Sequence, residues 1–221
     1  AYLSPRCSFP LCSFMPCRFM GVTLPSRLAT VLTDRPRVVI LASGQGSLAA
    51  ALIARSLENQ TSQKYQISAV ISDQPAAPVL AMAQKAGIPT QGVELASDRI
   101  LWEEALGDAV AHFSPQLVVS AGFMRILSPH FLSRFRVINS HPSLLPAFPG
   151  AHAVRDALAA GARQSGCTVH WVDEGVDTGE VIAQRIVEVL PGDTVPTLHE
   201  RIKVVERELL VSVVEDLVKG S

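Results

Sequence analysis

The stretch VVILASGQGSLAAAL, residues 38–52, combines an apolar run, a glycine-rich turn and apolar residues at helical spacing. Gly44 and Gly46 permit a tight turn and a close backbone approach. We expect Ser47 to cap the helix that follows. The free N–H groups and the dipole at such a helix start favour an anion. The stretch therefore predicts a strand–turn–helix unit that binds a phosphate group.

The turn alone does not identify the phosphate ligand. It lacks the Gly-Lys-Ser/Thr ending of a P-loop. It matches G-x-G-x-x-A at Gly44, Gly46 and Ala49, and Asp73 ends the next apolar run, where a dinucleotide site places its ribose-binding acid. Asp73 lies 27 residues past Gly46, however, which exceeds the usual spacing of ~20. An NAD-dependent dehydrogenase remains a competing interpretation at this point.

Strand-like and helical segments alternate after this unit, and the strands are apolar on both faces. The expected strands are 37–42, 65–73, 89–95, 116–121 and 136–141, and the expected helices are 47–60, 76–87 and 97–113, the last with Ser97 as its N-cap. This pattern predicts an α/β fold with a Rossmann-like, mostly parallel sheet and helices on both faces. Near the C-terminal end we expect a helix at 157–166, antiparallel strands at 167–173 and 180–190, and a closing helix at 193–220.

Composition narrows the function classes. The chain has 221 residues, 48% hydrophobic and 18% charged, with a net charge of −1. No basic stripe indicates a nucleic-acid partner, and no apolar run reaches the roughly 18 residues of a membrane helix. We therefore expect small-molecule substrates. Cys167 is the only cysteine after Cys17, so a reducing, cytoplasmic location fits.

The first residues differ from the rest of the chain. Residues 1–33 contain Arg6, Arg18 and Arg27, no acidic residue, and many Ser, Pro and Cys. The spacing of Cys7, Cys12 and Cys17 matches no common zinc pattern, and we expect no metal there. Such a composition is typical of a transit peptide. An extension ahead of the true start, with Met20 as initiator, is the alternative that we favour. We expect residues 1–35 to be a leader or extension and 36–221 to form a single domain.

A second polar motif, VINSHPSLLPAFPG, occupies residues 137–150. Asn139 and His141 are two apart on a strand, so they project from the same face. They lie at the carboxyl end of a parallel strand, where open α/β sheets bind ligands, and Pro142 ends the strand there. An amide can hydrogen-bond a developing oxyanion, and an imidazole can stabilise it or move a proton. The pair is therefore a candidate for stabilising an oxyanion and moving a proton, and the alternative is a structural role, which is common for an isolated Asn-x-His.

The histidine needs a charged partner, and residues 173–182 supply four candidates: Asp173, Glu174, Asp177 and Glu180. Asp177 lies between two glycine-containing turns, so it can approach a substrate closely. A carboxylate beside His141 would favour its imidazolium form. His152 and His170 are candidates for supporting positions.

No activated nucleophile is evident in the sequence. Ser140 points to the opposite strand face from His141, and the chain has no G-x-S-x-G elbow. We therefore expect direct transfer to an external amine or water, without a covalent enzyme intermediate.

Four motifs together resemble a known family. ILASGQGS, SAGFMRILSP, INSHPSLLPAFPG and CTVHWVDEGVDTGEVI, in this order, resemble the phosphoribosylglycinamide formyltransferases of the folate-dependent formyltransferase superfamily. The resemblance runs from about Arg37 to Lys219. It implies a formyltransferase domain that transfers the formyl group of 10-formyltetrahydrofolate to the amine of N1-(5-phospho-D-ribosyl)glycinamide in purine (IMP) biosynthesis. It also implies no metal and a monomer or homodimer.

The resemblance assigns roles residue by residue. Asn139 would hold the tetrahedral oxyanion, His141 would stabilise it and shuttle a proton, and Asp177 would tune the histidine and order a water. The ribonucleotide would contact Gly46, Ser47, Leu48, Gly122, Pro142, Lys203 and Glu206. The folate would contact Arg99, Met124, Arg125, Ile126, Leu127, Asn139, Val172 and Glu174.

Two positions depart from the family pattern. Leu48 stands where the family often has Asn, so a side-chain contact to the phosphate is lost while the backbone N–H can still serve. Ser140 stands where many relatives have Ile or Thr, which leaves the Asn-x-His geometry undisturbed.

Two sister enzymes share the same catalytic residues. Methionyl-tRNA formyltransferase adds a C-terminal RNA-binding domain, whereas this chain stops at Ser221. Formyltetrahydrofolate deformylase adds an N-terminal regulatory domain, for which ~36 leading residues are too few. The deformylase, in which water is the acceptor, is the runner-up, because the catalytic residues alone would not separate it from the transferase.

Overall fold

The computed structural model describes residues 35–58 and 64–219. The expected leader therefore lies outside the described residues, except for Arg35. The ends of the expected helices at 47–60 and 193–220 also fall partly outside them. Within the described residues no helix is both long and apolar enough to cross a membrane.

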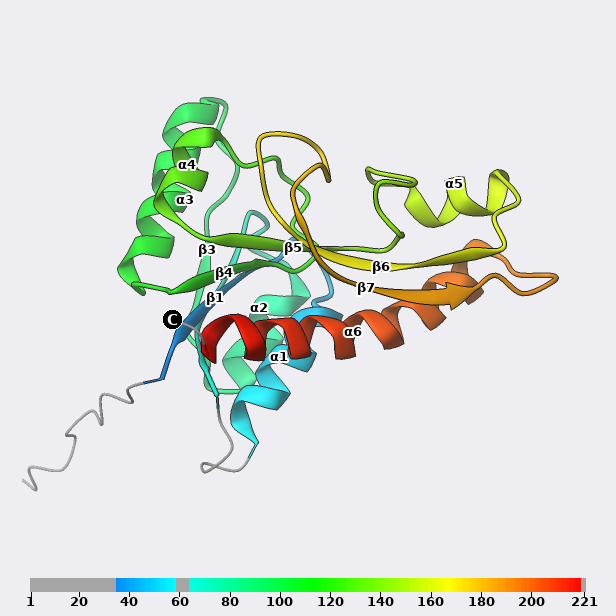
Figure 1. The fold of residues 1–221 in the computed structure, drawn as a ribbon. Coiled ribbons are helices and arrows are strands. Elements are labelled where there is room, and N and C mark those ends of the chain that lie inside the picture. The colour runs from blue at the N-terminus through cyan, green and yellow to red at the C-terminus, as the bar shows by residue number, and fades with distance from the viewer. Residues whose placement is uncertain (1–34, 59–63, 220–221) are drawn as a thin grey trace, which may run out of the picture. The chain divides into compact units, whose positions relative to one another are not determined.

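A seven-stranded sheet organises the chain, in the order β3-β2-β1-β4-β5-β6-β7 (Figure 1). The first five strands pair in parallel, β6 runs antiparallel to β5, and β7 runs antiparallel to β6. This confirms the predicted fold class. The strands are β1 Arg37–Leu41, β2 Gln66–Ser72, β3 Thr90–Gly92, β4 Leu117–Ser120, β5 Val137–His141, β6 Gln164–Trp171 and β7 Val181–Glu188.

Helices cover both faces of the sheet. They are α1 Ser47–Leu57, α2 Pro78–Lys85, α3 Arg99–His112, α4 Pro129–Arg134, α5 Ala153–Ala159 and α6 Val195–Lys219. Helices α1, α2 and α6 lie on one face, and α3 and α4 lie on the other (Figure 1). Alternate β1 residues enter the two resulting cores, with Val38 and Ile40 on the α1/α6 side and Val39 and Leu41 on the α3/α4 side. A strand buried on both faces is therefore apolar throughout.

Two local predictions were wrong. Asp98, not Ser97, caps α3, because its carboxylate accepts hydrogen bonds from the Ile100 and Leu101 N–H groups at 2.9 and 3.2 Å. The helix expected at 157–166 begins earlier and ends at Ala159. The residues from Gln164 instead belong to β6, because β7 provides their backbone partners. Pairing with a distant strand overrides the local helical preference of this polar segment.

The strand register places the residues that follow β4 beside the Asn-x-His pair of β5. Ser120 of β4 pairs with Asn139 of β5, so the segment that follows β4 begins beside the end of β5. On the other side of β5, Asn139 pairs with His170 and His141 pairs with Thr168 of β6. The carboxyl ends of β1, β4 and β5 therefore bring the glycine turn, residues 121–128 and the Asn-x-His pair to one edge of the sheet.

Candidate active site

The glycine turn ends in a backbone geometry that favours glycine. Gly46 is the N-cap of α1 and has φ +79°, in the left-handed region. A Cβ at this position would lie 2.3 Å from Cγ2 of Val79, so a side chain would clash as well as strain the backbone. No side chain of the described residues caps this helix, so the prediction of a Ser47 cap was wrong. The first-turn N–H groups thus remain available to an anion.

Hydrogen bonds tie the glycine turn to the segment after β4. The Ser43 N–H donates to the Gly122 carbonyl at 3.2 Å, and the Met124 N–H donates to Ser43 Oγ at 3.0 Å. Ser43 Oγ in turn donates to Asp73 Oδ1 at 2.5 Å, and Arg125 Nε donates to Asp73 Oδ2 at 2.6 Å. The predicted phosphate turn and the predicted folate segment therefore share one buried carboxylate.

Asp73 does not face a ligand. It is 2% exposed, and the hydrogen bonds from Ser43 and Arg125 occupy both of its oxygens. Burial by itself would raise the pKa of Asp73, but these hydrogen bonds and the Arg125 charge lower it overall. The dehydrogenase interpretation needs this acid to bind a ribose, and the structure commits it to a structural ion pair instead.

The three predicted catalytic side chains lie together. Asn139 and His141 come from β5, and Asp177 comes from the segment between β6 and β7. His141 Nδ1 lies 3.2 Å from Asp177 Oδ2, and Asn139 Nδ2 lies 3.4 Å from Asp177 Oδ1. Residues 38 apart in sequence therefore form one hydrogen-bonded group.

Asp177 is held as a carboxylate. Its φ of +55° lies in the left-handed region, and the Gly150 N–H donates to its Oδ2 at 2.8 Å. His170 Nε2 lies 3.5 Å from its Oδ1. Burial would raise the pKa of Asp177, but the hydrogen bonds from His170 and Gly150 and the charges of both histidines lower it overall. A negative charge therefore stays beside His141 at neutral pH.

Both ring nitrogens of His141 face oxygen atoms. Nδ1 faces Asp177, and Nε2 lies 2.9 Å from the Phe148 carbonyl oxygen. A ring nitrogen that carries a proton can donate to the oxygen that it faces. Asp177 and Phe148 thus hold the His141 ring from both sides.

His170 orients the asparagine. Its Nδ1 lies 2.8 Å from the Trp171 carbonyl oxygen, and its Nε2 lies 3.2 Å from Asn139 Nδ2 and 3.5 Å from Asp177 Oδ1. The ring therefore contacts Asn139 and Asp177 together. His170 is buried beside its cross-strand neighbour Asn139, whereas His152 is exposed at the start of α5. Of the two histidines considered for supporting positions, His170 is the one that contacts Asn139 and Asp177.

Two backbone groups of this site were not anticipated from the sequence. The Phe148 carbonyl contacts His141, and the Gly150 N–H contacts Asp177. Backbone groups carry no residue-type signal. The prolines of residues 142–149 indicated an irregular segment but not where it folds back.

The residues expected around the ribonucleotide occupy different surroundings. Gly46, Ser47 and Leu48 form the start of α1, Gly122 adjoins Ser43, and Pro142 follows His141. On α6, half-buried Lys203 pairs with Glu200 at 2.8 Å, whereas Glu206 is buried and accepts a hydrogen bond from Ser140.

The residues expected around the folate lie mainly after β4. Met124 and Ile126 are 70% and 59% exposed, which is unusual for apolar side chains, while Leu127 is buried. Arg99 donates to the Ile126 carbonyl and lies over the Trp102 ring at 4.9 Å, so it reaches this segment from α3. Arg125 is engaged by Asp73. The other expected folate contacts follow β6. The Val172 N–H donates to the Val137 carbonyl oxygen at 2.9 Å, and Glu174 is exposed.

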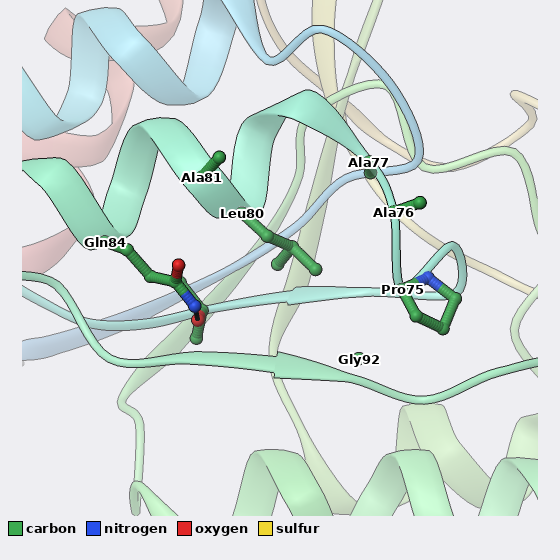
Figure 2. A pocket seen from close by; sticks show the side chains of 8 residues that line it. Pro75, Ala76, Ala77, Leu80, Ala81, Gln84 and Gly92 are labelled. Carbon is green, nitrogen blue, oxygen red and sulfur yellow. Dashed lines mark hydrogen bonds between the residues drawn. The ribbon is translucent and has the colours of Figure 1, made fainter.

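A separate surface pocket lies between α2 and the edge strand β3 (Figure 2). Its volume is about 430 Å³, and its lining residues carry no titratable group. They are Pro75, Ala76, Ala77, Leu80, Ala81, Gln84, Thr90 and Gly92. Acid–base chemistry is therefore available at the Asn139–His141–Asp177 group and not in this pocket.

Comparisons with known proteins agree with this geometry. The formyl transferase family model matches residues 36–214. A phosphoribosylglycinamide formyltransferase of Mycobacterium tuberculosis (strain ATCC 25618 / H37Rv) is 50% identical over 185 residues, which cover 82% of this chain and 84% of the relative. The human trifunctional purine biosynthetic protein adenosine-3 is 41% identical, over 85% of this chain and 19% of that protein.

Solved structures give the same result. Glycinamide ribonucleotide transformylase 1 from Symbiobacterium toebii superposes with a TM-score of 0.81 at 36% identity, covering 84% of this chain and 89% of that one. The phosphoribosylglycinamide formyltransferase from Brucella melitensis gives 0.79 at 40% identity, covering 85% and 98%. On this evidence, the chain belongs to the formyl transferase family.

Proposed function

We propose that this chain transfers the formyl group of 10-formyltetrahydrofolate to the amine of N1-(5-phospho-D-ribosyl)glycinamide, a step of IMP synthesis. The observation that carries the proposal is the hydrogen-bonded group of Asn139, His141 and Asp177, placed at the same sheet edge as the uncapped start of helix α1. The names of the relatives support both the reaction and the acceptor. Residues 36–221 would act as one catalytic domain, as a monomer or homodimer.

The chemistry is a direct acyl transfer. The amine lone pair attacks the formyl carbon, and the carbonyl electron pair moves onto oxygen. The Asn139 amide and the His141 imidazolium donate to this oxyanion. In the complex the oxyanion replaces the Phe148 carbonyl as the acceptor for His141 Nε2, because a charged oxygen is the stronger acceptor. Collapse breaks the bond to folate N10, and the proton lost by the amine reaches N10 through His141 or an ordered water beside Asp177.

The binding roles follow the arrangement of the strand ends. The ribonucleotide phosphate would bind the N–H groups of Gly46, Ser47 and Leu48, where Leu48 offers its backbone alone. The folate ring would cover the exposed side chains of Met124 and Ile126, which no described part of the chain covers. Glu206 and Lys203 would contact the ribonucleotide from α6.

A cytoplasmic location is part of the proposal. Cys167 is the free cysteine of the described residues, and it is buried. A folded part that contains one thiol and needs no disulfide suits a reducing compartment.

The acceptor separates this proposal from a deformylase. The test is consumption of 10-formyltetrahydrofolate by the purified chain, with and without the ribonucleotide. Turnover that depends on the ribonucleotide supports the transferase. Equal turnover without it would mean that water is the acceptor, and the proposal would fail.

A further inference from the structure

Ser140 lies between the two catalytic residues of β5 but faces the other side of the sheet. Asn139 and His141 share the face of Val137, on the α3/α4 side, whereas Ser140 shares the face of Ile138, on the α1/α6 side. Its hydroxyl donates to Glu206 Oε1 of α6 at 2.7 Å. The two residues are 7% and 4% exposed. One strand therefore presents catalytic groups on one face and fixes a carboxyl group on the other.

The Glu206 carboxyl group is costly for the fold. Burial raises its pKa, although the Ser140 hydrogen bond and the charges of Lys203 and Arg207 oppose this. Among residues 35–58 and 64–219, Ser140 is its one hydrogen-bond partner, and the second oxygen is not among the fully buried, unpartnered side-chain atoms. That oxygen can therefore still be reached, and it can accept a hydrogen bond from a ligand.

We propose that Ser140 is a positioning residue for the ribonucleotide, because it holds Glu206 in the orientation that accepts hydrogen bonds from the hydroxyl groups of that substrate. The inference rests on the proposed function, in which Glu206 contacts the ribonucleotide. Oε1 accepts the Ser140 hydrogen bond, which fixes the carboxyl plane and leaves Oε2 to accept from the substrate. Without the hydroxyl, the carboxyl group loses the contact that fixes its plane, and substrate binding must then order it. Ser140 itself touches no reacting atom.

The chain offers a matched control. Ser165 of β6 is also a buried serine, at 1% exposed, but its hydroxyl has no hydrogen-bond partner in the described residues. Ser140→Ala and Ser165→Ala remove the same atom from neighbouring strands, and only the first removes a bond to Glu206. Ser140→Thr retains the hydroxyl and suits a strand.

The experiment measures KM for each substrate, kcat, and the dissociation constant of the ribonucleotide by calorimetry. Ser140→Ala is expected to raise the KM and the dissociation constant of the ribonucleotide roughly tenfold, in line with loss of a hydrogen bond to a charged group. The values of kcat and of the folate KM should stay within about twofold, since a positioning role affects only the binding contact. Ser140→Thr should restore ribonucleotide binding, and Ser165→Ala should match the wild type.

A double-mutant cycle with Glu206→Gln tests whether the effect passes through Glu206. In that background, Ser140→Ala should change ribonucleotide binding by less than about twofold. Unchanged ribonucleotide binding in Ser140→Ala, an equal loss for both substrates, or full additivity in the cycle would overturn the inference. If the wild type binds the ribonucleotide without transferring a formyl group, the proposed function fails. The ratio of the ribonucleotide dissociation constants of Ser140→Ala and the wild type still decides the role of Ser140. A wild type that does not bind it would overturn both.

Discussion

His141 shows how the proposed catalytic group depends on atoms of several segments. Its ring is fixed between the Asp177 carboxylate and the Phe148 carbonyl. Asn139 is fixed in the same way by His170 and Asp177. Donors that are held in place before the reaction need little reorganisation when charge develops on the substrate.

Replacement of His141 tests the importance of this ring. His141→Ala removes the charged donor and the proton shuttle, so turnover should fall by at least about a thousandfold. The melting temperature checks that the fold survives. His112→Ala is the matched control, because His112 is exposed at the end of α3. More than a tenth of wild-type turnover in His141→Ala would contradict the assigned role.

The charge of Asp177 predicts a pH effect. Its pKa is lowered in the folded state, so the wild-type carboxylate is ionised throughout the neutral range. Asp177→Asn keeps the side-chain shape but removes the titrating carboxylate and its negative charge. Wild-type turnover should therefore persist to a pH below the ordinary carboxyl range before it falls, whereas Asp177→Asn should lack this carboxylate-dependent acid limb. An Asp177→Asn profile that differs from the wild type only in height would show that charge is not what Asp177 supplies.

The β1–α1 unit shows how a turn determines what an element can bind. Its two glycines differ: Gly46 has a left-handed backbone and no room for a Cβ, whereas a Cβ at Gly44 would meet nothing within 4 Å. The turn therefore needs glycine at position 46 for structural reasons and tolerates a side chain at position 44. Because of this contrast, a substitution at Gly44 is a matched control for the same substitution at Gly46.

Gly46→Ala should therefore destabilise the protein, whereas Gly44→Ala should not. A left-handed alanine costs about 1–2 kcal/mol, and displacement of Val79 adds to this. At roughly 2–4 °C per kcal/mol for a domain of this size, the melting temperature should fall by at least about 4 °C. Gly44→Ala should melt within about 1 °C of the wild type. Equal melting temperatures for the two variants would refute the geometric argument.

Helix α6 carries an acid that weakens the fold when it is charged. The folded-state pKa of Glu206 is raised, so between about 4.3, its unfolded value, and that higher value the folded chain binds more protons than the unfolded chain. Stability is therefore lost as the pH rises through this window. Glu206→Gln should melt close to the wild type near pH 4.5 and above it at pH 8. A difference that is the same at both pH values would contradict the burial argument.

The fold of the described residues follows largely from sequence patterns, because strands buried on both faces and alternating with helices allow few arrangements. The group of Asn139, His141 and Asp177 was predicted from strand geometry and a family resemblance, and the three side chains do lie together. The Asp73–Arg125 pair was not predictable, since it joins residues 52 apart through their tertiary positions. The same holds for β6, whose first residues become a strand only because β7 pairs with them.

In the proposed reaction, one site moves a formyl group directly from folate to an amine. The most direct measurement follows 10-formyltetrahydrofolate labelled with ¹³C in the formyl group, by NMR, in the presence of the purified chain and the ribonucleotide. Direct transfer predicts that essentially all of the label appears in the formamide of the ribonucleotide product and almost none in free formate. Label that accumulates in formate at a rate independent of the ribonucleotide would contradict it.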